Sequence, residues 1–376
     1  MKTQLLTIIG ASACLLFMPA YADNGKSSSE KKKLCESVFK LAMDTTEKKL
    51  KIMPSGKRKR HIQKRMVKAK SQGVAPCLKA KIDAKMLKQR LKYFVRQQES
   101  IKKNSEKVDK LIVLLKTGTS LVKLQSIKEL RRHSDIRAVG PLIEILKGKD
   151  IKVKVSVIRA LNVIKDRKSV DPLIAILKNG DVKLRREAAS TLGELEDSRV
   201  IAPLIAALKD NDTYVRSSSA FSLMKFNDQR IIDAFITHLK ADKNDKKSIR
   251  NLAVMGLSRS GSPKVIAPLI NLLKNDKDPV LRGQVVRSLG ILYGQHKKAD
   301  ALDAILFALK DSHAGIREAT VRALLELKDP KTVTPLRAAL ENEEKMLKLT
   351  KDVSIQQKNA GIIKLIKYTL TRISKK

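Results

Sequence analysis

Residues 169–178 read SVDPLIAILK, and the stretches 138–147 (AVGPLIEILK), 200–209 (VIAPLIAALK) and 265–274 (VIAPLINLLK) carry the same pattern. Eight such segments occur between residues 108 and 340, with equivalent positions 31 to 36 residues apart. The proline suits the first turn of a helix, where its missing N–H costs nothing, and the apolar residues after it have helical spacing. A period of this length predicts a solenoid built from stacked repeats.

A second helix follows the first one in each repeat. A short polar turn such as Asn179-Gly180-Asp181 separates the two, and its Asp can cap the second helix. Apolar residues then recur at helical spacing, for example at Leu184 and Ala188. Neither helix can bury its apolar face alone, so successive pairs must stack. We therefore predict an all-α chain whose repeats span residues 106–340.

The repeats resemble those of a known family of helical-repeat proteins. The Pro-Leu-Ile of the first helix, the Asp of the turn and the basic residue early in the second helix are similar to short HEAT-like repeats of the type named after phycobilisome lyases, over about residues 107–340. The resemblance implies a right-handed α-α superhelix, a HEAT-like solenoid. The family includes lyases, hydroxylases and scaffolds without activity, so function must be argued from particular residues.

Motifs for catalysis and metal binding are missing from the sequence. The hydroxylases with such repeats carry His-Glu pairs that bind iron, whereas none of the five histidines here precedes a Glu. Zinc-ligand spacing, the nucleophile-elbow pattern and the phosphate-loop pattern are missing as well. We predict a binding protein that is not an enzyme and that uses no metal or other cofactor.

Stacking places equivalent residues in columns, and one column near the start of the second helices is basic in seven repeats. We call it the turn column: Lys123, Lys154, Arg185, Arg216, Arg250, Arg282 and Arg317. Four of its members lie four residues after an Asp, and in HEAT-like repeats such a residue typically links neighbouring turns. This structural role is the favoured interpretation, and a basic binding ridge is the alternative.

A second column lies five residues further along and should face partly outward. This face column consists of Lys128, Arg159, Ser190, Phe221, Met255, Arg287 and Arg322. Its ends are basic and its middle is apolar, so a long acidic or amphipathic partner protein could lie along it, with Phe221 and Met255 as anchors. A solvated face with two incidental apolar residues is the alternative.

The N-terminal segment, residues 23–105, differs in composition from the repeats. Residues 51–100 hold 16 Lys and Arg against two acids, a net of 16 − 2 = +14. We expect two or three helices, broken near residues 54–56 and 72–76, that cap the first repeat. Such charge predicts salt-dependent affinity for polyanions. The residues predicted to carry it are Lys57, Arg58, Lys59, Arg60, Lys64 and Arg65.

The first 22 residues match a secretory signal peptide. Lys2 precedes an apolar stretch, residues 5–17, and residues 20–22 supply a small-x-small cleavage site. Cleavage after Ala22 predicts a periplasmic or secreted protein, and a lipoprotein signal that uses Cys14 is the alternative. The polyanions met there are envelope glycans, lipid head groups and extracellular nucleic acid, the last being disfavoured by export.

Export also bears on the two cysteines that remain after cleavage. In an oxidising compartment we predict a disulfide between Cys35 and Cys77, with two reduced, unrelated thiols as the alternative. The charge of the whole chain is 79 − 38 = +41, which indicates either polyanion binding or simply a soluble exported protein.

Composition and the C-terminus complete the prediction. A hydrophobic content of 43% supports an ordered core, and 3% aromatic residues with no Trp disfavour a sandwich or barrel. No apolar run after the N-terminus approaches the roughly 20 residues of a membrane-spanning helix. Residues 341–376 depart from the repeat, and an amphipathic helix over 355–373 is expected to cap the solenoid, which favours a monomer.

Overall fold

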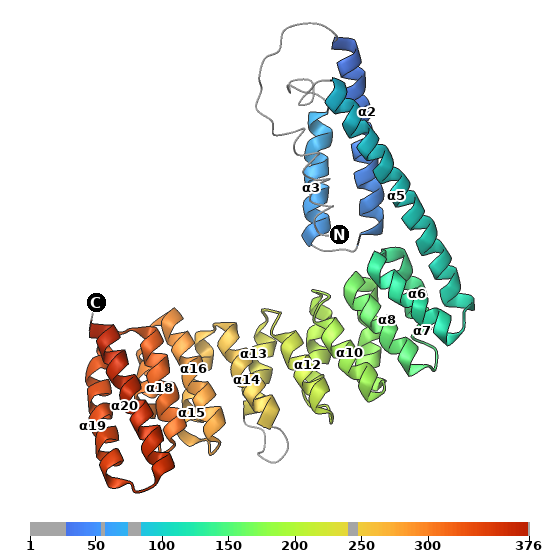
Figure 1. Ribbon diagram of the computed structural model, residues 1–376. Helices are drawn as coiled ribbons and strands as arrows, with labels where there is room; N and C mark the ends of the chain where they lie inside the picture. The colour runs from blue at the N-terminus through green and yellow to red at the C-terminus, as the bar shows by residue number, and fades with distance from the viewer. Residues whose placement is uncertain (1–27, 54–56, 74–83, 240–246, 375–376) are drawn as a thin grey trace. The chain divides into compact units, whose positions relative to one another are not determined.

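The computed structural model describes residues 28–53, 57–73, 84–239 and 247–374, and every regular element in those ranges is a helix. The chain divides into two compact units, residues 1–197 (unit 1) and residues 198–376 (unit 2). Within each unit the helices follow one another as antiparallel pairs (Figure 1). The fold is the all-α superhelical repeat that the sequence predicts.

The described residues of unit 1 begin with the helices α2 (Ser28–Ile52), α3 (Lys57–Gln72) and α5 (Ala84–Thr117). α2 packs along α5, and α3 contacts α2 (Figure 1). A small core of buried side chains joins α2 to α5, formed by Cys35, Val38, Ala42, Leu87 and Phe94. The described helices α2 and α3 end at Ile52 and Gln72, while most of the breaks predicted at residues 54–56 and 72–76 lie outside the described residues.

Helix α5 is longer than the sequence pattern indicates. The predicted boundary between residues 105 and 106 lies inside it, and its last turns supply the first helix of the first repeat through the buried Val108, Leu111 and Leu115. No Pro or Gly occurs between Ala84 and Thr117, so nothing interrupts the backbone hydrogen bonds. The basic N-terminal helices are therefore continuous with the repeats.

Unit 1 continues as helix pairs joined by tight turns. Its further α-helices are α6 (Ser120–His133), α7 (Val139–Ile145), α8 (Ile151–Ile164), α9 (Val170–Asn179) and α10 (Val182–Leu192). The predicted caps are present, since the Asp150 carboxylate accepts N–H bonds from Lys152 at 2.9 Å and Val153 at 3.2 Å, and Asp181 caps α10. The second helices α6, α8 and α10 pack side by side in chain order.

Unit 2 repeats this construction. Its α-helices are α11 (Ile201–Ala207), α12 (Thr213–Leu223), α13 (Gln229–Leu239), α14 (Lys247–Ser260), α15 (Ile266–Asn275), α16 (Pro279–His296), α17 (Ala299–Phe307), α18 (Ala314–Leu327), α19 (Val333–Leu349) and α20 (Val353–Ser374). The second helices α12, α14, α16 and α18 contact one another in order.

Short 3-10 turns, each beginning near an Asp or Ser, lead into many of the first helices. They are η1 (Ile136–Ala138), η2 (Arg167–Ser169), η3 (Ser198–Val200), η4 (Pro263–Val265) and η6 (Pro330–Thr332), while η5 (Ala308–Lys310) ends α17. The Leu after each helix proline is fully buried, as the repeat pattern predicts. These residues are Leu142, Leu173, Leu204, Leu269 and Leu336.

The C-terminal end closes unit 2 with two long helices. α19 runs to Leu349, past the predicted end of the repeats at residue 340, because no helix breaker follows Pro335. α20 packs on both α18 and α19 and buries Ile362 and Ile366, which lie on the apolar face predicted for residues 355–373. The charged stretch after residue 340 is thus part of a helix and not a linker.

Candidate functional site

The turn column links neighbouring turns in unit 2, as favoured from the sequence. The Arg216 guanidinium donates hydrogen bonds to the backbone carbonyls of Asp210 at 2.8 Å and Asn211 at 2.9 Å. Arg282 donates to the carbonyl of Asp276 at 2.7 Å and, through Nε and Nη2, to both carboxylate oxygens of Asp311 at 2.9 and 3.0 Å. Each Arg of this kind satisfies carbonyls that the end of a helix leaves open.

Two further members of the turn column form buried ion pairs. Arg250 pairs with Asp276, and Arg317 pairs with Glu343 while also donating to the Asn359 side chain at 3.3 Å. Burial would raise the pKa of Asp311, but its hydrogen bonds from Arg282 and from the backbone of His313 outweigh burial and lower that pKa. The turn-column cations of unit 2 therefore already have hydrogen-bond or ion-pair partners within the chain.

In unit 1 the face column is exposed on the second helices. Lys128 of α6, Arg159 of α8 and Ser190 of α10 are all exposed. Arg159 reaches across to Glu187 of α10, donating from Nε at 3.0 Å, and this hydrogen bond raises the pKa of Arg159. The contact joins two neighbouring second helices at their surface.

In unit 2 the face column combines apolar and basic side chains. Phe221 of α12 is 52% exposed, Met255 of α14 is half-buried, and Arg287 of α16 and Arg322 of α18 are exposed. Arg322 is held by Glu318 of its own helix, with Nη2 at 2.6 Å. Because α12, α14, α16 and α18 pack in order, these four side chains occupy successive helices of one unit.

Two exposed apolar residues next to face-column members, one in each unit, were not predicted from the sequence. Ile291 lies one turn after Arg287 on α16 and is 52% exposed. Val163 has the equivalent place after Arg159 on α8 of unit 1 and is also exposed. Their position four residues after a face-column member was the available signal, because residues four apart share one face of a helix.

The predicted polyanion-binding residues lie on or next to α3. Arg60 and Lys64 are exposed, Arg65 is half-buried, and Lys59 donates to the carbonyl of Met53 at 2.9 Å. The side chains of Lys57 and Arg58 lie outside the described residues. Among its described side chains α3 buries only Ile62 and Ala69, and many of the others are basic and face water.

Several sequence predictions have no direct structural test. Cys35 is fully buried between α2 and α5, but Cys77 lies outside the described residues, so the disulfide stays a prediction. Residues 1–22 also lie outside the described residues. In the part of the chain that the structure covers, no group of three or more His, Cys, Asp or Glu is placed to hold a metal ion, and no helix has the length and apolarity to cross a membrane.

Comparison with known proteins agrees with the repeat pattern. A family model described as HEAT repeats matches residues 139–224, 201–290 and 266–349. No curated protein matches the chain in sequence.

Among solved structures, the CpcE and CpcF complex of phycocyanin lyase from Nostoc sp. is 18% identical, over 61% of this chain and 94% of that chain, with a TM-score of 0.36. Human deoxyhypusine hydroxylase is 14% identical, over 70% of this chain and 96% of that chain, with a TM-score of 0.30. Kap121p is 14% identical, over 99% of this chain and 49% of that chain, with a TM-score of 0.46.

Proposed function

Because this chain belongs to the HEAT-repeat family, we propose that it is an exported scaffold that binds an acidic partner protein through residues of the face column. The observation that carries the proposal is the exposure of apolar side chains among cations on the second helices of unit 2. Phe221 and Ile291 are each half-exposed, and Arg287 lies one turn from Ile291. Fully burying a side chain of this size contributes about 1.5–3 kcal/mol, so these residues can anchor a partner.

The charge of the face column favours an acidic partner. Lys128 and Arg287 form no ion pair among the described residues, whereas Arg159 and Arg322 are paired with surface carboxylates. Exposed pairs of that kind contribute about 0–1 kcal/mol, so a carboxylate of the partner can replace them at little cost. The net charge of +41 would also speed the encounter with an acidic surface.

Binding, and not catalysis, is the activity that we propose. Two groups with strongly shifted pKa values, Asp228 and Tyr293, both serve turns between helices. A hydrogen bond from Arg230 lowers the pKa of Asp228 to about 2, and a hydrogen bond to Asp329 raises the pKa of Tyr293 to about 12. Both shifts have structural causes, and neither group has the partners of a general acid or base.

The compartment is part of the proposal and rests on residues 1–22, which lie outside the described residues. A mature chain beginning at Asp23 would act in the periplasm or after release. Cell fractionation followed by N-terminal sequencing tests this: we expect an N-terminus at Asp23 in the envelope or medium. An intact N-terminus in the cytosolic fraction would contradict it.

The scaffold proposal is tested by affinity capture from an envelope extract at about 0.05 M and about 0.5 M salt, which span weak and strong screening. We expect a discrete acidic partner that survives high salt and is lost in the Phe221→Asp/Met255→Asp variant. The matched control is Phe307→Asp, an equally exposed Phe on the first helix α17. Capture that is the same in both variants would contradict the face-column site.

A second candidate function, polyanion binding, is favoured by one observation on α3. Its exposed Arg60 and Lys64 stand in a stretch, residues 57–82, that contains no acid. We expect retention on heparin to fall log-linearly with salt and to weaken in Arg60→Gln/Lys64→Gln. The control is Lys183→Gln/Lys209→Gln, which removes the same charge from exposed sites on the repeats. Equal losses in the two variants would mean that net charge alone explains retention.

A further inference from the structure

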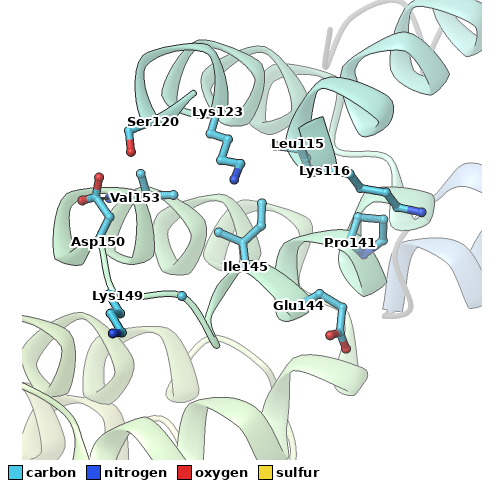
Figure 2. Close-up of a pocket in the computed structure, with 11 residues that line it drawn as sticks. Leu115, Lys116, Ser120, Lys123, Pro141, Glu144, Ile145, Lys149, Asp150 and Val153 are labelled. Atoms are coloured by element: carbon cyan, nitrogen blue, oxygen red, sulfur yellow. Dashed lines mark hydrogen bonds between the residues drawn. The ribbon is translucent and has the colours of Figure 1, made fainter. Parts of the chain in front are cut away.

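A pocket of about 520 Å³ opens in unit 1 where the first two repeats meet. The end of α5, the start of α6, helix α7 and the turn that leads into α8 surround it, and Figure 2 shows the Lys123 side chain reaching into it from α6 toward Ile145. Its apolar wall is formed by Leu115, Pro141, Ile145 and Val153. The pocket thus combines an apolar wall with one inward-pointing ammonium group.

The acids at this pocket are already engaged, while its cations are not. Glu144 pairs with Lys147 at 2.8 Å, and Asp150 accepts two backbone N–H bonds of α8. The side-chain amines of Lys116, Lys123 and Lys149 form no hydrogen bond or ion pair within the described ranges. The lining carries three Lys and two acids, 3 − 2 = +1, which suits a ligand with a single negative charge.

The turn column in unit 2 shows which group is missing here. Arg250 pairs with Asp276, and Arg282 with Asp311. Each of these aspartates lies two residues before the N-cap of the next second helix, since Asp278 caps α16 and His313 stands at the N-cap of α18.

The first repeat lacks both halves of that pair. Lys123 stands in the place of the Arg, and Gly148, two residues before the N-cap Asp150, stands in the place of the Asp. The next repeat follows the same rule, with Lys154 and Asn179. Where the column holds Lys, the chain supplies no carboxylate to it, and beside Lys123 the space is a pocket.

We propose that this pocket binds a carboxylate side chain from an acidic partner segment, which takes the place beside Lys123 that Asp276 and Asp311 hold in unit 2. The aliphatic part of a Glu, or a neighbouring apolar side chain, would contact Leu115, Ile145 and Val153. A dianion such as phosphate is disfavoured by Asp150 and Glu144 at the rim. This inference rests on the proposed function in taking the partner to be acidic, but it uses a surface distinct from the face column.

The test compares two variants of the full chain that differ only in charge, Gly148→Asp and Gly148→Asn. A Cβ at this position lies 3.2 Å from the Ile145 carbonyl oxygen in both, so the two share any strain. The probe is a fluorescein-labelled peptide with blocked ends, Ser-Leu-Glu-Leu-Ser, followed by fluorescence anisotropy. We expect Gly148→Asn to bind like the unmodified chain and Gly148→Asp, which supplies its own carboxylate, to bind at least tenfold more weakly. Equal affinities would overturn the proposal.

A second measurement locates the site without changing Gly148. A carbodiimide couples the peptide Glu to a lysine amine in contact with it, and mass spectrometry identifies that lysine. We expect the cross-link at Lys123, with binding lost in Lys123→Gln and with a Gln-containing peptide. Cross-links spread over exposed lysines such as Lys183 and Lys209, with unchanged binding in Lys123→Gln, would overturn the proposal.

The experiments distinguish failure of the scaffold proposal from failure of the pocket proposal. Phe221→Asp/Met255→Asp lies in unit 2 and leaves the pocket untouched, so this variant should bind the short peptide with unchanged affinity. If it loses the captured partner while the two Gly148 variants bind the peptide equally, the scaffold stands and the pocket is wrong. If the Gly148 variants differ tenfold while capture is insensitive to the face column, the pocket stands alone.

Discussion

Three turn-column members of unit 2, Arg250, Arg282 and Arg317, pair with carboxylates of the chain, whereas Lys123 at the start of unit 1 does not. Arg282 in unit 2 holds both oxygens of Asp311, whereas Lys123 in unit 1 faces a pocket beside Gly148. The guanidinium fork can donate to turn carbonyls and to a carboxylate at once, while an ammonium group acts as a point charge. The same position of the repeat therefore stabilises the stack in one region and leaves a cation available to a ligand in the other.

The largest effect should come from breaking one of these ion pairs of unit 2. Arg317→Met leaves Glu343 buried without its partner, and such an uncompensated charge costs about 3–5 kcal/mol. Urea unfolding followed by circular dichroism measures the loss. The control in unit 1 is Lys154→Met, for which a change within about 0.5 kcal/mol is expected because Lys154 is only half-buried. Similar losses in the two variants would contradict the contrast between the units.

A smaller effect should reveal how closely the helices of unit 2 approach. At Gly256 on α14 an added Cβ would lie 2.4 Å from the Phe235 ring of α13, so Gly256→Ala should cost about 1–3 kcal/mol by overpacking. At Gly283 on α16 nothing lies within 4 Å, and Gly283→Ala should stabilise the chain by about 0.5–1 kcal/mol. The same unfolding measurement checks both variants. If both changes stabilised the chain, the Phe235 ring would not restrict the side chain at position 256.

Introducing the missing ion pair into the first repeat tests whether the space beside Lys123 is the place of a carboxylate. In Lys123→Arg/Gly148→Asp the first repeat regains the pair found in unit 2, and we expect a coupling energy of about 1 kcal/mol between the two changes. A double-mutant cycle of unfolding free energies measures it, with Lys123→Arg/Gly148→Asn as the uncharged control. Additive effects in the first cycle would mean that the two side chains do not meet, and that the space is not the vacant place of an ion pair.

Features that recur in every repeat could be predicted from the sequence, whereas the lengths of individual helices could not. The proline and leucine of each first helix, the Asp caps and the linking role of the Arg residues all recur at fixed spacing, so each repeat supports the interpretation of the others. The lengths of α5 and α19 could not be obtained this way, because a helix continues past its repeat wherever no Pro or Gly stops it. The predicted boundaries at residues 105 and 340 therefore lie inside helices.

The binding surfaces were predictable only in part. The face column was predicted from its position in each repeat. Ile291 could have been predicted as well, because residues four apart share one face of a helix. The pocket could not be seen in the sequence, because it arises from two small departures from the repeat. Lys123 replaces an Arg and Gly148 replaces an Asp, and a list of basic residues treats the first as equivalent and ignores the second.

The smallest predicted effect concerns pH and follows from Asp311. Its folded pKa lies below the ordinary value of 3.8, because the hydrogen bonds from Arg282 and from the His313 backbone outweigh its burial. A lowered folded pKa means that the unfolded chain binds the proton more readily, so this stabilisation is present above about pH 3.8 and is lost as the pH falls through the folded pKa. Acid should therefore weaken the ion pair between Arg282 and Asp311.

The measurement is the unfolding free energy between about pH 2 and pH 6 for the unmodified chain and for Asp311→Asn. Asn keeps an oxygen that can accept the N–H of His313 but does not titrate. We expect the two stabilities to converge as the pH falls below about 3.8, and to differ by a constant amount above it, where Asp311 is fully charged. A difference that stays constant across the whole range would mean that the charge of Asp311 contributes nothing, and Arg282 would then stabilise this turn only through its hydrogen bond to the Asp276 carbonyl.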